Sequence, residues 1–110
     1  KERIAAQLCK IRHWKCFEGY YTLLPNQTAH WFIDPPYEVA GKRYPHKVDD
    51  YFALAEWAKS RQGFVQVCEN DGALYLPFIP FKSVNTYHHM KQNGERKARY
   101  THEVIYEQGA

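Results

Sequence analysis

The sequence predicts a mixed α/β domain in which two parallel strands are joined by a crossover helix and the sheet ends in an antiparallel hairpin. Residues 29–33 form a short apolar run without polar alternation, which is typical of a strand buried on both faces of a parallel sheet. Residues 64–68 form a second buried-looking run, and the segment between the two carries apolar residues at helical spacing. Near the end of the chain, Asn93-Gly94 lies between two strand-like runs and is a strong hairpin signal.

Two further elements are predicted before the first parallel strand. Apolar residues recur at helical spacing from residue 2 to about residue 13, which indicates a helix. Residues 15–24 are rich in aromatic and β-branched side chains, which predicts a strand. Turn-forming residues occupy positions 25–28, so a turn is expected before the apolar run begins.

The crossover helix has ordinary start and stop signals. A loop is expected at residues 38–46, and Asp49 or Asp50 can cap the first turn of the helix that follows. The apolar stripe of this helix runs to about Arg61. Gly63 stands where a helix stop is expected, directly before the second parallel strand.

The last third of the chain is predicted to form a loop and the closing hairpin. The polar residues 69–72 indicate a loop after the second parallel strand. The hairpin strands are expected at residues 83–89 and 98–107. Because the residues next to the turn are polar on both sides, we expect the two strands to pair only partway towards it.

Composition and charge narrow the possible classes of protein. The chain of 110 residues is long enough for one domain, residues 1–110, and too short for two. With 45% hydrophobic residues and no apolar run near the ~18 residues of a membrane span, a folded protein outside the membrane is expected. Three irregularly spaced cysteines favour a reducing cytoplasm. The net charge of +3 is too small to identify a nucleic-acid partner by itself.

No metal site is predicted. Cys9, His13, Cys16 and His30 could in principle gather around an ion, but their spacing lacks the paired ligands of a structural zinc site. Free cysteines are often simply buried, so we expect these side chains to have no metal-binding role.

The residues most informative about function form the tetrapeptide Asp34-Pro35-Pro36-Tyr37. It follows the strand expected to be the most buried of the chain, and its two prolines must end the strand because they have no N–H to donate. In an open α/β sheet, ligands bind at the carboxyl ends of the strands. The tetrapeptide therefore brings an acid, a rigid backbone and an aromatic ring to the edge where a ligand is expected.

This tetrapeptide, with its apolar lead-in at residues 31–33, resembles the D-P-P-Y signature of S-adenosylmethionine-dependent amino-methyltransferases, where it follows the fourth strand. The resemblance continues through the loop, the helix near Asp50, the strand ending at residues 68–71 and the closing hairpin, so it covers most of the chain after residue 15. It is strongest to DNA adenine methyltransferases, including small phage-type enzymes. It implies a Rossmann-like methyltransferase fold, of which this chain would be the C-terminal catalytic portion.

The resemblance implies a role for each residue of the motif. Asp34 and the Pro35 carbonyl would accept hydrogen bonds from the amino group of adenine and would lie against S-adenosylmethionine. Pro36 would keep the backbone rigid, and Tyr37 would stack on a base flipped out of duplex DNA. The amine would attack the methyl group directly, so none of the cysteines is needed as a nucleophile.

Two further groups of residues are candidates for contacts with substrate. Lys42, Arg43 and Tyr44 lie just past the motif, where they would hold DNA phosphates or close over the flipped base; an exposed loop without such contacts is the alternative. Asn70 and Asp71 end the next parallel strand, so they either face the same crevice or only terminate the strand.

One part of the family pattern is missing, and two alternatives stay open. The glycine-rich loop that seats the cofactor after the first strand is not found, nor are the first three strands. We therefore expect an incomplete methyltransferase domain that binds S-adenosylmethionine poorly by itself. The alternatives are a ribosomal-RNA guanine amino-methyltransferase, which carries a similar Asp-Pro-Pro-aromatic motif, and a non-catalytic nucleic-acid-binding remnant of the fold.

Overall fold

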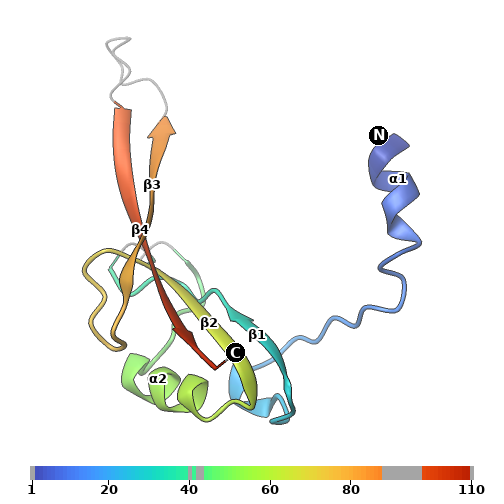
Figure 1. Ribbon diagram of the computed structural model, residues 1–110, viewed down its shortest axis with the longest axis horizontal. Coiled ribbons are helices and arrows are strands. Elements are labelled where there is room, and N and C mark those ends of the chain that lie inside the picture. Colours follow the sequence, from blue (N-terminus) through green and yellow to red (C-terminus); the bar gives the residue numbers. More distant parts are fainter. Residues whose placement is uncertain (1, 40, 42–43, 88–97, 110) are drawn as a thin grey trace.

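The computed structural model describes residues 2–39, 41, 44–87 and 98–109, and its centre is a four-stranded mixed sheet. Its strands are, in chain order, β1 (Ala29–Ile33), β2 (Gly63–Asn70), β3 (Ile79–Tyr87) and β4 (Ala98–Gln108). In the sheet they lie side by side in the order β1-β2-β4-β3 (Figure 1). β1 and β2 are parallel, whereas β4 runs antiparallel to both of its neighbours. The predicted α/β class, with a parallel pair and a closing hairpin, is confirmed. None of the described helices is long and apolar enough to cross a membrane.

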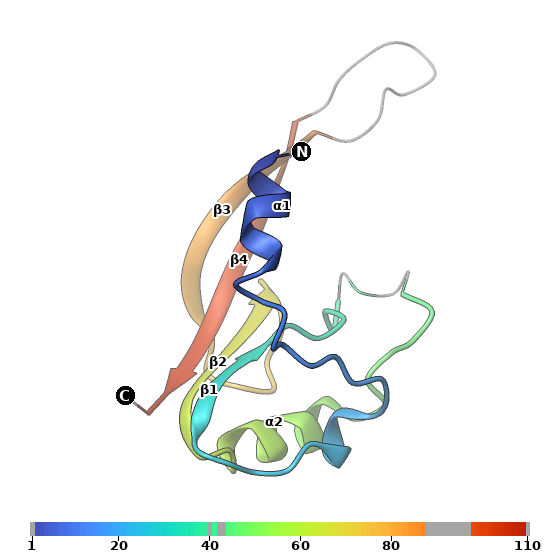
Figure 2. The same cartoon turned by 90° about the vertical axis from the view of Figure 1, so that its right-hand side faces the viewer.

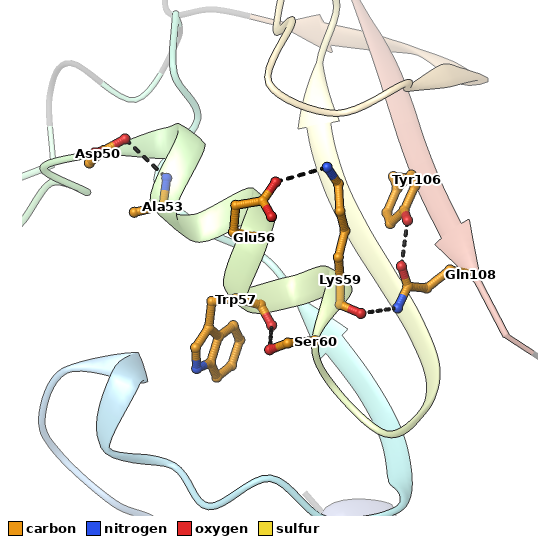
Figure 3. A network of polar contacts seen from close by, with 8 residues as sticks. All are labelled: Asp50, Ala53, Glu56, Trp57, Lys59, Ser60, Tyr106 and Gln108. Atoms are coloured by element: carbon orange, nitrogen blue, oxygen red, sulfur yellow. Dashed lines mark hydrogen bonds and ion pairs between the residues drawn. The ribbon is translucent and has the colours of Figure 1, made fainter.

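The crossover helix α2 (Tyr51–Lys59) joins the two parallel strands and lies against one face of the sheet (Figure 2). Of the two candidate caps, Asp50 is the one used. Its side chain accepts a hydrogen bond from the Ala53 N–H at 3.0 Å (Figure 3). The carboxylate thereby satisfies one of the backbone donors that the first turn of a helix leaves without a partner.

Hydrogen bonds from two directions fix the C-terminal end of α2, slightly before the predicted end (Figure 3). The Ser60 hydroxyl donates to the Trp57 carbonyl at 2.6 Å, which closes the last turn. The Gln108 side-chain amide donates to the Lys59 carbonyl at 2.9 Å, and the Tyr106 hydroxyl donates to Gln108 in turn. The end of β4 therefore holds the end of the helix against the sheet.

The core forms where α2 packs on β2. Leu54, Ala55 and Ala58 of the helix and Val65 and Val67 of the strand are all almost completely buried. The helix residues share one face because they are one and four positions apart, and the strand residues share one face because side chains alternate along a strand. This packing fixes α2, which connects β1 to β2, against one face of the sheet.

The strand predicted at residues 15–24 is wrong. The segment is irregular and contains a short 3-10 turn, η1 (Tyr21–Leu23). Strand formation needs a neighbour for the backbone hydrogen bonds, and none of the described strands pairs with this segment. Two of its aromatic residues contact the helix region instead: the Tyr20 hydroxyl donates to Asp49, and the Tyr21 ring lies edge-on to Trp57 with their centroids 5.0 Å apart.

The N-terminal helix is shorter than predicted. α1 (Glu2–Leu8) ends well before residue 13 and stands clear of the sheet (Figure 1). Its apolar side chains Ile4 and Leu8 are 67% and 52% exposed. Short helices are marginal in water unless an apolar face packs on something, and this packing is absent among the described residues.

β2 is longer than predicted, because it includes two residues that were expected in the loop at 69–72. Glu69 pairs with Val104 of β4, and Asn70 pairs with Glu103. Pairing with β4 therefore extends β2 beyond the apolar residues from which the strand was predicted.

The predicted hairpin is confirmed: its first strand begins four residues earlier than expected, and its second begins at Ala98 as predicted. β3 and β4 pair from Ile79↔Ile105 to Tyr87↔Ala98, with an irregularity near Pro80. The turn expected at Asn93-Gly94, and with it the extent of pairing towards the turn, lies outside the described residues. β4 is inserted between β2 and β3 rather than added at the edge.

Candidate active site at the end of the parallel strands

The tetrapeptide lies past the carboxyl end of β1, as predicted. Asp34 is exposed, whereas Pro35, Pro36 and Tyr37 are half-buried. Within the described part of the chain, no hydrogen bond reaches the Asp34 carboxylate or the Pro35 carbonyl. Both oxygen acceptors are therefore available to a ligand.

The backbone after Pro35 is held from several sides. The Tyr51 hydroxyl, at the start of α2, donates to the Pro36 carbonyl. The Gly41 N–H donates to the Tyr37 carbonyl at 2.7 Å. A Cβ atom on Gly41 would lie 2.8 Å from the carbonyl carbon of Pro36, so only glycine fits this close approach. The motif is thus a rigid turn whose free acceptors are at its beginning.

The Tyr37 side chain reaches across to the antiparallel part of the sheet. Its hydroxyl donates to Glu103 Oε2 of β4 at 3.1 Å. Burial raises the pKa of the Tyr37 phenol strongly, and the nearby negative charges of Asp34 and Glu103 raise it further. The phenol therefore keeps its proton and remains a donor, which fixes the position of the ring.

Cys68 is the cysteine nearest to this site. It is half-buried near the end of β2, and burial raises the pKa of its thiol, with smaller contributions from Asp34 and Glu103. A raised pKa keeps the thiol neutral, and a neutral thiol is a poor nucleophile. The arrangement around Asp34 therefore favours chemistry that does not use a cysteine adduct.

Glu69, which the sequence analysis missed, is completely buried beneath the motif. Its Oε1 accepts hydrogen bonds from the Glu38 N–H at 2.8 Å and from the Tyr75 hydroxyl at 3.1 Å, and its Oε2 accepts one from the Asn70 N–H at 2.9 Å. Side chains alternate between the two faces of a strand, so Glu69 lies on the same buried face as Val65 and Val67. This spacing is the sequence signal that could have identified it.

Replacing Glu69 by glutamine is expected to flatten the dependence of stability on pH. Burial raises the pKa of this carboxyl above its unfolded value of 4.5, although its three hydrogen bonds oppose the shift. The folded state then holds the proton more tightly, so the contribution to stability is full below pH 4.5 and is lost as the pH rises through the folded pKa. Urea unfolding from about pH 4 to 8 measures this. An identical pH profile in Glu69→Gln would contradict the prediction.

An open cavity of about 620 Å³ lies beside Asp34. Asp34, Pro35 and Pro36 line it, whereas Tyr37 does not. Its volume falls within the ~300–1,000 Å³ that small-molecule sites occupy. The aromatic part of its lining comes from the segment before β1, from β1 itself and from α2. These residues are Tyr20, Tyr21, Trp31, Phe32 and Trp57.

Among the described residues, none of the other predicted contact residues lines this cavity. Lys42 and Arg43 lie outside the described residues, and Tyr44 is exposed. Asn70 and Asp71 do not line the cavity beside Asp34. The cavity is lined instead by two basic residues further along the chain, His46 and Lys47.

Comparison with known proteins gives no match: no protein family, no curated protein and no solved structure is significantly similar to this chain. What the molecule does has to be inferred from the geometry around Asp34. The features that matter are an exposed carboxylate, a rigid proline pair and the open cavity beside them.

Proposed function

We propose that this chain is the catalytic portion of an S-adenosylmethionine-dependent DNA methyltransferase that methylates the exocyclic amino group of adenine. The observation that carries the proposal is the environment of Asp34. Its carboxylate is exposed at the carboxyl end of the parallel pair and receives no hydrogen bond from the described residues. A carboxylate and a carbonyl held side by side as free acceptors suit an N–H donor group.

The chemistry follows from the nature of the amine. The lone pair of an exocyclic amino group is delocalised into the ring, which makes it a weak nucleophile. Hydrogen bonds from that group to Asp34 and to the Pro35 carbonyl help to localise the lone pair and aim it at the methyl donor. Bonds of this charge-assisted kind contribute ~1.5–3 kcal/mol each. Because the prolines fix the backbone in advance, the acceptors need no reorganisation when substrate arrives.

The cavity beside the motif supports S-adenosylmethionine as the proposed cofactor. The cavity of about 620 Å³ is lined by Asp34 and Pro35, the residues to which the resemblance assigns cofactor contacts. The aromatic side chains of its lining offer faces on which an adenine ring can stack. When bound, S-adenosylmethionine supplies an electrophilic methyl group on a positively charged sulfur.

The order of the elements supports the same proposal. The motif follows a parallel strand, and a crossover helix, a second parallel strand and an antiparallel hairpin come after it. These are the features that the resemblance to amino-methyltransferases implies for this part of the domain. The neutral Cys68 thiol is consistent with direct transfer to the amine.

Tyr37 supplies the stacking ring of the proposed site. Stacking of a base on an aromatic ring contributes ~1–3 kcal/mol, and flipping a base out of the duplex costs a few kcal/mol. A ring whose hydroxyl is already fixed on Glu103 loses little freedom on binding. Lys42, Arg43 and Tyr44 lie just past the motif and are proposed to contact the DNA backbone, with Lys47 adding a cation at the cavity.

The test is methyl transfer from labelled S-adenosylmethionine to unmethylated bacterial DNA by the full-length protein that contains this chain. Nuclease digestion then identifies the labelled nucleoside. Label in methylated adenine is the expected result. Label only in RNA guanine would favour the ribosomal alternative, and absence of label would favour a nucleic-acid-binding module without catalysis.

Two substitutions at Tyr37 separate the ring from its hydroxyl. Tyr37→Phe keeps the ring and removes the hydrogen bond to Glu103, so kcat/KM is expected to fall only about 5-fold, as for a loss of ~1 kcal/mol. Tyr37→Ala also removes the stacking surface and is expected to lower it by about a further 5- to 150-fold. Steady-state kinetics on duplex DNA measures both. Equal losses in the two variants would mean that the ring does not contact the base.

A further inference from the structure

Glu69 is the single buried charged side chain among the residues whose burial the structure describes, with none of its surface exposed. A buried carboxylate is costly unless other groups compensate its charge. In the described part of the chain it has no cationic partner, and its compensation comes entirely from hydrogen-bond donors.

The donors join the carboxyl ends of the two parallel strands. Glu38 follows the tetrapeptide directly, and its N–H points to Oε1 of Glu69 at 2.8 Å. The Asn70 N–H and the Tyr75 hydroxyl hold the same carboxylate from β2 and from the segment after it. Glu69 is therefore fixed on its own strand and reaches across to the loop that leaves the motif.

The hydrogen bond from the Glu38 N–H to Glu69, which we call the tether, attaches the end of the motif where no acceptor role is proposed. β1 holds the start of the motif through the pairing of Ile33 with Val67. The carbonyls of Pro36 and Tyr37 and the N–H of Glu38 are all engaged. Between these two fixed ends lie the free acceptors on which the proposed chemistry depends.

We propose that Glu69 is a positioning residue, whose buried carboxylate ties the exit of the D-P-P-Y turn to β2 and so holds the Asp34 and Pro35 acceptors in one orientation. The effect on catalysis rests on the proposed function, whereas the tether itself does not. Misplacing a reacting group by ~1 Å can cost about 100-fold in rate. Loss of the tether is therefore expected to lower kcat more than it raises KM.

Three variants of the full-length protein separate the tether from general stability. Glu69→Ala removes all acceptors of the Glu38 N–H. Glu69→Gln keeps one acceptor oxygen, but its NH₂ group cannot accept, so it can satisfy only part of the donor set. Tyr75→Phe is the matched control: it removes one donor to the same Oε1 and leaves the contact with Glu38 intact.

Hydrogen exchange of the motif gives a readout that does not depend on catalysis. Pro35 and Pro36 carry no amide hydrogen, so a peptide covering residues 35–38 reports only on Tyr37 and Glu38. Exchange in this peptide is expected to be at least about 10-fold faster in Glu69→Ala, less affected in Glu69→Gln and unchanged in Tyr75→Phe. Unchanged exchange in a folded Glu69→Ala protein would overturn the tether. If that variant does not fold, the parent protein decides: a Glu38 amide that exchanges as fast as in an unstructured peptide would overturn the tether.

Kinetics then decides the positioning role. With the tether lost, kcat for methyl transfer is expected to fall about 10- to 100-fold, while KM for DNA changes less than about 3-fold. A variant with fast exchange and normal kcat would overturn the positioning role while leaving the tether. Fast exchange in the variants of a parent protein that transfers no methyl group would support the tether and reject the proposed function.

Discussion

Replacing Asp34 by alanine in the full-length protein is expected to lower kcat/KM for adenine methylation by about 10- to 150-fold for each hydrogen bond lost, as for ~1.5–3 kcal/mol. The thermal midpoint should change little, because Asp34 is exposed and no described residue donates a hydrogen bond to it. Asp34→Asn keeps one acceptor oxygen without the charge, so its kcat/KM is expected to lie between those of the parent protein and Asp34→Ala. Labelled methyl transfer and thermal unfolding measure the two effects separately.

Asp71 offers a matched control for this substitution. It is also an exposed aspartate just past a parallel strand, but it does not line the cavity beside Asp34. Asp71→Ala is therefore expected to retain full activity. If Asp34→Ala methylates DNA as well as the parent protein does, Asp34 is only structural and the proposed chemistry fails. Equal losses of activity in Asp34→Ala and Asp71→Ala would show that the overall negative charge at the carboxyl ends of the parallel strands matters, rather than the Asp34 carboxylate itself.

Replacing Gly63 by alanine is expected to lower the free energy of unfolding by about 2 to 5 kcal/mol, from ~1–2 for backbone strain and ~1–3 for overpacking. Gly63 has φ +102°, a conformation that side chains rarely adopt. A Cβ here would lie 2.1 Å from the carbonyl oxygen and 2.8 Å from the nitrogen of Ala29. Ala29 is its partner in the parallel register, so relief of the clash must disturb the pairing of β1 with β2. Urea unfolding measures the loss.

Gly72 isolates the steric part of this effect. Its φ of +101° is nearly the same, but a Cβ at this position would meet nothing closer than Val39 Cγ2 at 3.8 Å. Gly72→Ala is therefore expected to cost only the backbone strain of about 1–2 kcal/mol. The same loss in both variants would show that the close approach at Ala29 does not limit what residue 63 can be.

Elements with a local signal could be predicted from the sequence. The apolar run at residues 29–33 became β1 with the predicted bounds, and Asp50 became the cap of α2. The expected burial of this strand on both faces is wrong, because β1 lies at the edge of the described sheet and its residues alternate between half-buried and exposed. Prolines end a strand by their own chemistry, which placed Asp34 at the end of β1. The hairpin followed from its turn signal, although that turn itself lies outside the described residues.

Features that depend on distant neighbours could not be predicted in the same way. The aromatic residues at 15–24 have the composition of a strand, but strand preference depends on a partner that the composition does not reveal. Glu69 has the polar character of a loop residue, and only the addition of β4 beside β2 makes it part of a strand. The contact of Tyr37 with Glu103 was equally hidden, because the two residues are 66 positions apart.

The insertion of β4 between β2 and β3 sets the order in which the molecule can be assembled. β4 is synthesised after both strands that it joins, so on the ribosome β3 has no neighbour until β4 emerges. Contacts of such long sequence separation form slowly and leave strand edges open in the meantime. The Asp34 loop, whose tyrosine is held by Glu103 of β4, is translated early and acquires its final geometry late. A nascent chain is therefore expected to be without a working site until translation has passed β4.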